Sequence, residues 1–519
     1  MARSLVNAVS IDEALEKTKF GKFNYFIICV SGLILINVIM ETLGISFVLP
    51  ITKCDLELTY QDKGILGAVG FLGIITSSHL WGFLADTNGR RKVIAPTLLA
   101  GYFVSVVSSF SPNFVTLAIL RYLNGFLVSG ASATIFAYLG EFHCNKLRNR
   151  AIMSAAFVAA ICALAHPIMG WAVINRYWSF YVPLVDIVYK PWRMYILCCG
   201  LLGFVSGLCF IVLPESPKYL ISIGKETEAI AVLKMVYSIN TGNKAESLEV
   251  YSIVPDVEDE QRLKLIRGED LYIVFLFRSM WNQTAPLFKR EHLRKTLLSC
   301  LIQFWIFFSA QGLYMWFPSL LNTVMQFTKD FPDERNQMCN IFYKVERTTS
   351  KEDEAQDTTC VQTLEITTFQ HTFGLEVIFV AILVFIGYFT GKLGRRPSLF
   401  IILFICGSCG VLSVLVDIPI IAVYFLVVLL VCAISSSVLS AVIVDIFPTH
   451  LRAMAVCICL MMGRIGSVIG TNVIGALIEN HCQLAILLAS SFLLSGAFTA
   501  FLLPKGASSK KDQNISIET

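Results

Sequence analysis

Two stretches of this sequence, about three hundred residues apart, repeat each other. Residues 82–92 read GFLADTNGRRK and residues 387–397 read GYFTGKLGRRP. Both fit the pattern G-x6-G-R-R without a gap, and their starts differ by 305 positions (387 − 82). Each motif ends one apolar segment and opens the next. Two similar membrane halves are typical of secondary transporters, in which the substrate site lies between the halves.

A second pair of segments supports the duplication. Glu141, Leu147 and Arg148 match Asp445, Leu451 and Arg452 at an offset of 304 (445 − 141). Each set of three residues follows the fourth helix of its half, so the repeat extends beyond one loop.

Hydropathy places the chain in a membrane. It has 519 residues, of which 55% are hydrophobic and only 15% are charged, and its mean hydropathy is +0.68. A bilayer core of ~30 Å needs ~20 apolar residues per helix. We therefore expect an all-α membrane protein with twelve transmembrane helices in two six-helix halves. The predicted helices are 24–50, 64–85, 93–110, 114–139, 151–175, 193–213, 296–324, 374–391, 398–416, 419–444, 453–478 and 483–503.

Domain organisation follows from these segments and from the cations between them. Lys and Arg cluster after helices two, four, eight and twelve, which predicts that both termini are cytoplasmic. The charged N-terminus lacks the features of a signal peptide. The predicted parts are a cytoplasmic segment 1–23, a first half 24–213, a linker 214–295, a second half 296–503 with an outer loop 325–373, and a cytoplasmic tail 504–519. Residues 226–237 of the linker have helical spacing of apolar positions and predict a helix packed under the bundle.

We expect the repeated motifs to form a charged network at the membrane boundary. Gly82 and Gly89 suit a sharp turn between antiparallel helices, and Asp86 lies near Arg90 and Arg91. Such a network can hold one conformation of the halves and break in the other. The simpler alternative is that the arginines only mark the cytoplasmic side. The other expected gating residues are Glu141, Arg148, Gly394, Arg395, Arg396, Asp445 and Arg452.

Two charges lie deep in the predicted helices, where a charge is expensive. Glu41 is nine residues before Pro50, so it lies ~14 Å below the outer end of helix one. Arg464 is twelve residues after Arg452, which is ~18 Å into helix eleven. We hypothesise that both face a central cavity, where Arg464 binds an anionic group and Glu41 takes up a proton or pairs with Arg464. The alternative is a buried structural ion pair, or two separate pairs with backbone groups.

Helix seven carries hydrogen-bonding and aromatic groups in an apolar run. Gln303, Gln311 and Tyr314 fall close to one helix face, and Trp316 follows. An aromatic surface with a few polar groups suits a small organic molecule. Lipid contact and interfacial anchoring explain the same residues equally well.

Cysteine positions suggest one disulfide and no metal site. Cys54, Cys339, Cys360 and Cys482 fall on the predicted outer side. Cys339 and Cys360 share one loop and are a candidate pair in an oxidising compartment, although spacing alone cannot show that they meet. No His/Cys cluster has metal-ligand spacing, and we expect no cofactor.

Several segments resemble known families. The 82–92 motif resembles the loop signature of the major facilitator superfamily, and PESPKYL at 214–220 looks like the P-E-S-P-R signature of its sugar and organic-ion branch. RYLNG at 121–125 resembles a helix-four R-x-x-x-G motif, which implies a structural or proton-linked role for Arg121. The synaptic vesicle glycoprotein 2 family is similar over nearly all of the membrane part, in FVLP at 47–50, KGILG at 63–67, YLGEF at 138–142, MWFP at 315–318 and DIFPTHLRA at 445–453.

We therefore expect a secondary transporter of a small organic solute, and an organic anion if Arg464 binds it. It would act by alternating access in the plasma membrane or a vesicle membrane, with a proton or another ion as the coupling candidate. The chain has no P-loop or nucleophile motif, so we do not expect an enzyme, and a net charge of +4 gives no case for nucleic acid. The alternative is a transporter-like vesicle protein that binds partner proteins, since Gly391 replaces a common Asp and weakens the second gate.

Overall fold

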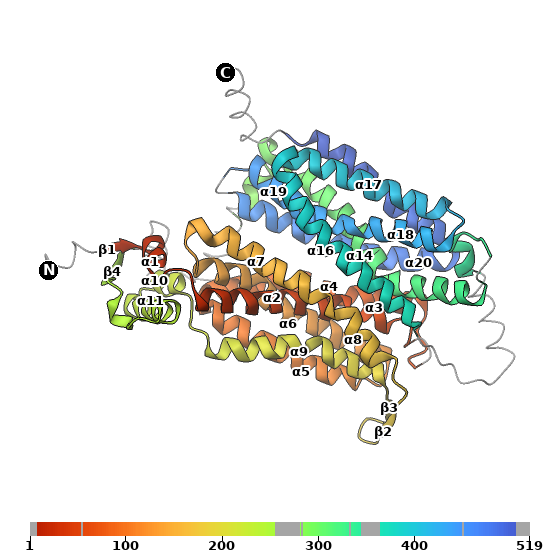
Figure 1. Cartoon of the computed structure of the whole chain (residues 1–519), viewed down its shortest axis with the longest axis horizontal. Helices are drawn as coiled ribbons and strands as arrows, with labels where there is room; N and C mark the ends of the chain where they lie inside the picture. The colour runs from red at the N-terminus through yellow and green to blue at the C-terminus, as the bar shows by residue number, and fades with distance from the viewer. Residues whose placement is uncertain are drawn as a thin grey trace, which may run out of the picture.

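The computed structural model describes residues 8–52, 55–254, 281, 284–331, 334–343, 364–448 and 451–504. Within these residues, twelve helical segments are long and apolar enough to cross a bilayer. They form two bundles of six, which Figure 1 shows as a red-to-yellow half and a green-to-blue half. The predicted all-α fold with two six-helix halves is confirmed. The predicted cytoplasmic tail beyond residue 504 lies outside the described residues.

The first half runs from residue 22 to residue 212. A short bend at Gly44 divides its first span, and Leu164 divides its fifth. The spans are α2 (Lys22–Leu43) with α3 (Ile45–Val48), α4 (Tyr60–Asn88), α5 (Arg90–Ser109), α6 (Phe114–Glu141), α7 (Asn145–Ala163) with α8 (Ala165–Ile174), and α9 (Pro191–Val212). A two-stranded antiparallel hairpin, β2 (Phe180–Val182) and β3 (Ile187–Tyr189), precedes α9.

The second half runs from residue 290 to residue 502, after a 3-10 turn, η2 (Ala285–Phe288). Its last two spans are a single long element that breaks at His481, whose φ of −141° and ψ of 49° are not helical. The elements are α14 (Arg290–Asp330), α16 (Ile366–Leu393), α17 (Arg395–Leu415), α18 (Pro419–Leu430) joined through η3 (Val431–Ile434) to α19 (Ser435–Ile446), and α20 (Arg452–Leu502). We call the end of the bundle where α2 begins and α20 finishes the terminal end. The opposite end is the loop end.

Local sequence signals set several helix boundaries. The Thr59 hydroxyl accepts the Asp62 N–H at 3.2 Å while the Asp62 carboxylate accepts the Thr59 N–H at 3.0 Å, which caps α4. Gly89 and Gly394 end α4 and α16 with φ of +106° and +88°. A side chain is strained at such angles, so the two repeat glycines occupy the same structural position for the same reason.

A small polar unit lies against the terminal end of the first half (Figure 1). Its core is made by apolar side chains from both the N-terminus and the linker, including Leu15, Leu220 and Leu233. Asp12 accepts the backbone N–H of Asn145 at 2.7 Å, which fixes the unit to the start of α7. The predicted linker helix is present and packs as expected. The unit comprises β1 (Ala8–Ser10), α1 (Ile11–Lys17), α10 (Pro217–Ser222), α11 (Glu226–Thr241), η1 (Ala245–Ser247) and β4 (Ser252–Val254), with β1 and β4 paired in parallel.

The two halves pack against each other at the loop end. Phe47 stacks on Phe369 with ring centroids 5.5 Å apart, and Tyr60 stacks on Trp316 at 6.0 Å. Each pair joins one residue of the first half to one of the second. Aromatic side chains therefore close this end of the interface between the halves.

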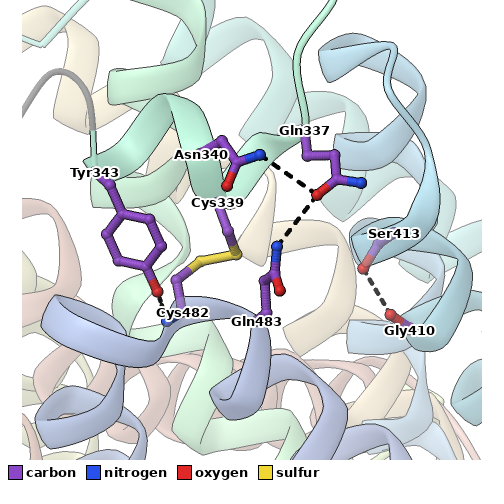
Figure 2. The surroundings of a disulfide bond; sticks show 8 residues. All are labelled: Gln337, Cys339, Asn340, Tyr343, Gly410, Ser413, Cys482 and Gln483. Atoms are coloured by element: carbon purple, nitrogen blue, oxygen red, sulfur yellow. Dashed lines mark hydrogen bonds between the residues drawn. A yellow bond between two sulfur atoms is a disulfide. The ribbon is translucent and has the colours of Figure 1, made fainter.

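A disulfide in the second half joins Cys339 to Cys482, with the Cα atoms 5.5 Å apart (Figure 2). The expected Cys339–Cys360 pairing is therefore wrong, and Cys360 lies outside the described residues. The break at His481 turns the chain so that Cys482 meets the 334–343 segment. The Tyr343 hydroxyl also accepts the Cys482 N–H. Sequence spacing could not reveal this pair because the partners are 143 positions apart.

Removing this disulfide should lower thermal stability and free one thiol. Cys339→Ser leaves Cys482 unpaired, and loss of a native disulfide costs about 2–5 kcal/mol in small proteins. In the unfolded chain, we expect Cys482 of this variant to react with maleimide without prior reduction, whereas in the unaltered protein it reacts only after reduction. Peptide mass spectrometry distinguishes the two states. Reaction of Cys482 in the unreduced natural chain would contradict the pairing.

Candidate functional site

The first charged network lies at the terminal end, around Arg90. One guanidinium nitrogen of Arg90 is 2.9 Å from Asp86 and 3.1 Å from Glu141, while another donates to the Ala85 carbonyl at 3.1 Å. Arg90 is buried, which strengthens these interactions. The network thus joins the end of α4, the start of α5 and the end of α6.

Glu215, from the PESPKYL segment, adds a second part to this network. Its Oε1 accepts the backbone N–H groups of Arg90 at 3.0 Å and Arg91 at 3.1 Å, so it neutralises the free N-terminus of α5. The Arg91 side chain donates in turn to the Phe210 carbonyl at 3.1 Å. A Cβ on Gly89 would lie 2.4 Å from Glu215 Oε2, which explains the glycine.

The second half repeats this arrangement in a shorter form. Arg395 donates to Asp445 at 2.6 Å, as Arg90 does to Glu141. Arg396 donates to the Ala500 carbonyl at 3.0 Å, as Arg91 does to the end of α9. Arg452 donates to the Phe447 carbonyl at 3.0 Å, and Arg148 makes the matching bond to Gly140 at 3.2 Å in the first half.

The expected gating residues, Gly82 aside, lie in these two charged networks at the terminal end. Each network joins residues of one half and does not bridge the two halves. Gly82 is not needed for the turn, because a Cβ there would meet no atom within 4 Å and the turn itself is at Gly89. Asp86 has no acidic counterpart at Gly391, yet the Arg395–Asp445 pair remains. The second network is thus reduced rather than lost. A gating role for both networks stays a prediction.

Substituting Glu215 tests the extra part of the first network. Glu215→Ala leaves two partly buried N–H groups without their charged acceptor, so we expect the free energy of unfolding to fall by about 1–3 kcal/mol. Glu228→Ala is the matched control, because Glu228 is exposed and, within the described ranges, pairs only with Lys225. Thermal unfolding in detergent measures both, and equal effects of the two variants would contradict the capping role.

Glu41 lies inside the first half, paired with Arg121. Arg121 Nη1 donates to Glu41 Oε2 at 2.9 Å, and the Ser105 hydroxyl donates to Glu41 Oε1 at 2.6 Å. Arg121 also donates to Ser108 at 2.5 Å. Glu41 is 4% exposed and Arg121 5%, so both are sealed among α2, α5 and α6. The expected pairing of Glu41 with Arg464 is wrong, because depth along a helix does not fix the face on which a residue lies.

Arg464 lies instead at the interface between the halves. Its Nη1 donates to the Ser78 hydroxyl of α4 at 2.7 Å. Ser78 is ten residues from the end of α4, which is ~15 Å deep and close to the depth of Arg464. In the described part of the chain, no carboxylate lies within ion-pair distance of Arg464. A half-buried guanidinium without an acid partner, at mid-depth between two halves, is available to a ligand.

The residues of helix seven separate into two groups. Gln303 is buried and donates to Ser436 at 2.6 Å, and Trp316 is buried and donates to the Thr471 carbonyl at 3.1 Å. These two hold the second half together. Gln311 and Tyr314 are only partly buried, and among the described residues the enclosed Oε1 of Gln311 has no hydrogen-bond partner.

Glu376 is a membrane carboxylate that sequence reasoning missed. It lies on α16, where its Oε1 accepts the Tyr314 hydroxyl at 2.9 Å. The predicted span began at residue 374, which placed Glu376 at the membrane surface. α16 in fact begins at Ile366, eight residues before the predicted start. Residues 366–373, ITTFQHTF, contain no helix-breaking residue. Their absence of Gly and Pro was the signal that the helix could begin earlier.

Comparison with known proteins supports the fold. The sequence profile of the Major Facilitator Superfamily matches residues 27–337 and 364–518. Human synaptic vesicle glycoprotein 2A is 28% identical over 344 residues, which cover 63% of this chain and 46% of that protein. Human synaptic vesicle glycoprotein 2B is 26% identical over 318 residues, which cover 59% and 46%. The resemblance to this vesicle family is confirmed, and the chain spans about half the length of these curated relatives.

Solved structures of low sequence identity share the architecture. The inward open conformation of the xylose transporter XylE from E. coli superposes with a TM-score of 0.63 at 15% identity, covering 93% of this chain and 97% of that one. A bacterial homolog of the human lysosomal transporter Spinster, inward-facing and unoccupied, gives 0.62 at 11% identity, covering 93% and 98%. At these identities the likeness concerns the fold alone.

Proposed function

This chain belongs to the Major Facilitator Superfamily, and from that premise we propose that it is a secondary transporter of a small organic anion. The single observation that carries the proposal is Arg464, a guanidinium at mid-depth between the halves that has no carboxylate partner among the described residues. Because it contacts α4 of the opposite half, a solute bound there touches both halves at once. Carboxylates and sulfonates match the geometry of a guanidinium.

Gln311 and Tyr314 supply the rest of the proposed solute site. Both are on α14, three residues apart, so they share a face. An amide and a phenol, together with the Arg464 cation, favour an anion that also carries an aromatic ring. Glu41, Gln303 and Trp316, which were expected at this site, are buried and bonded elsewhere, so we assign them to the structure around it.

Alternating access is the proposed mechanism. Aromatic contacts such as Phe47–Phe369 close the loop end, whereas the charged networks of the terminal end lie within each half. Rocking of the halves about the mid-depth contact would open the loop end and close the terminal end. XylE, a structural neighbour, is described as a proton:xylose symporter, which supports a small solute and a coupling proton here.

The disulfide supports an orientation. Cys339 and Cys482 lie at the loop end, and disulfides persist in oxidising compartments. We therefore place the loop end outside the cell or in a vesicle lumen and the terminal end in the cytoplasm. Labelling of a Tyr177→Cys variant, whose position is exposed at the loop end, by an impermeant maleimide added to intact cells or to sealed vesicles tests this.

Uptake into liposomes tests the function. The purified full chain is reconstituted, and p-toluenesulfonate, 2-naphthalenesulfonate, tetraethylammonium and D-xylose are offered with and without a pH gradient. We expect accumulation of a sulfonate above protein-free liposomes. Accumulation of only the cation or the sugar would contradict the anion assignment. No accumulation of any probe would favour the alternative, a transporter-like protein that binds partners.

A further inference from the structure

We propose that Glu376 binds the proton that drives solute movement through this carrier. The inference rests on the proposed transport function and adds to it the site of the coupling ion. It starts from one arrangement in the second half, the Glu376 carboxylate bonded to the Tyr314 hydroxyl at 2.9 Å.

Glu376 lies inside the membrane span. It is ten residues from the start of α16 and seventeen from its end, which at ~1.5 Å per residue is ~15 Å and ~25 Å. The carboxylate is thus inside the membrane span. In the described part of the chain, no Lys or Arg lies within ion-pair distance of it. A carboxylate held there by one neutral hydroxyl is stable when it carries a proton.

Glu376 also meets the access requirement that Glu41 does not. Glu41 is 4% exposed and both of its oxygens are bonded, one of them to Arg121. Glu376 is only partly buried, and its second oxygen, Oε2, is not enclosed by protein. A coupling proton must enter and leave, so the accessible carboxylate is the better carrier.

Few other titratable groups surround Glu376 in the part of the chain that the structure describes. Tyr314 on α14 is the group that bonds Glu376, and Tyr195 on α9 is within electrostatic range of Tyr314. His166 on α8 packs against Phe47 and has an unpartnered Nε2. On α16 itself, His371 packs against Tyr424 of α18. The cations of the remaining neighbouring helices lie at the terminal end: Lys146, Arg148 and Arg150 on α7, and Arg395 and Arg396 on α17.

This location couples the proton to the movement of the halves. α16 packs against α8 of the first half, and Phe369, two turns before Glu376, stacks on Phe47 across the interface. Opening the loop end separates these rings and changes which side supplies water to Glu376. Tyr314 joins Glu376 to the proposed solute face of α14, so the proton site and the solute site share one residue.

Chemical labelling tests the site without a solute. Dicyclohexylcarbodiimide modifies protonated carboxyl groups in apolar surroundings. We expect mass spectrometry of the full chain in detergent to find Glu376 modified, with less modification as pH rises, and Glu41 unmodified. Glu376→Gln should abolish modification of the α16 peptide. No modification of Glu376 at any pH, or equal modification at every pH, would overturn the proposal.

Transport by the same variant separates this inference from the proposed function. For the sulfonate that the natural chain accumulates, Glu376→Gln should retain solute exchange between the two sides but lose accumulation driven by a pH gradient. Glu365→Gln is the control, since Glu365 is bonded to Lys329 outside the solute face. pH-driven accumulation by Glu376→Gln, or accumulation driven only by a sodium gradient in the natural chain, would refute the proton site and leave transport intact. If the natural chain transported none of the probes, the proposed function itself would be refuted.

Discussion

Replacing Arg464 with alanine should strongly reduce sulfonate uptake while leaving the protein folded. A hydrogen bond to a charged group contributes about 1.5–3 kcal/mol, so the affinity for an anion should fall about 10- to 150-fold. Folding should survive, because the only bond of Arg464 in the described residues is to the Ser78 hydroxyl. Arg464→Lys keeps the charge but not the two-pronged geometry, so we expect intermediate uptake.

Two measurements keep this prediction specific. Initial uptake rates at several solute concentrations separate weaker binding from slower turnover. Arg176→Ala is the matched control, because Arg176 is exposed just after α8 and, among the described residues, is bonded only to the Ala172 carbonyl. Unchanged uptake by Arg464→Ala, with thermal stability equal to that of the natural chain, would show that the solute site lies elsewhere.

The second large effect concerns the Glu41–Arg121 pair. Removing one partner of a buried ion pair leaves an uncompensated charge and costs about 3–5 kcal/mol. We expect Glu41→Leu or Arg121→Met alone to destabilise the protein strongly. The double variant should lose far less than the sum of the two, since no charge then remains. Unfolding in mixed micelles with increasing SDS measures the three free energies.

An exposed pair provides the comparison for this cycle. Glu16 and Lys146 are also bonded, at 2.8 Å, but both are solvated, so their double-mutant cycle should show no strong coupling. If the Glu41–Arg121 cycle were equally weak, the pair would not be holding α2 to α6. If the double variant folded but lost pH-driven accumulation, the proton would be carried here rather than at Glu376.

The duplicated architecture could be predicted because a sequence repeat becomes a repeat of geometry. The offset of 305 aligned Gly89 with Gly394 and Arg90 with Arg395, and the structure gives both glycines a positive φ and both arginines an acidic partner. Apolar length likewise predicted the twelve spans, because a bilayer requires it.

The candidate site was less accessible to sequence reasoning. Depth can be counted along a helix, but the face that a residue presents depends on how helices pack. Glu41 and Arg464 were therefore at similar predicted depths and yet have separate partners, Arg121 and Ser78. Glu376 was missed because the polar first turns of α16 concealed where the helix begins.

The relative motion of the halves is the most direct test of the account. Spin labels, introduced as unnatural amino acids, would be placed at Asn149 and Leu393 for the terminal end and at Tyr177 and Asn340 for the loop end, all of them exposed. Pulsed electron resonance then gives both distances in liposomes. With a sulfonate that the protein accumulates, we expect a population with a shorter terminal-end distance and a longer loop-end distance. Both distances unchanged by a transported solute would contradict alternating access of the two halves.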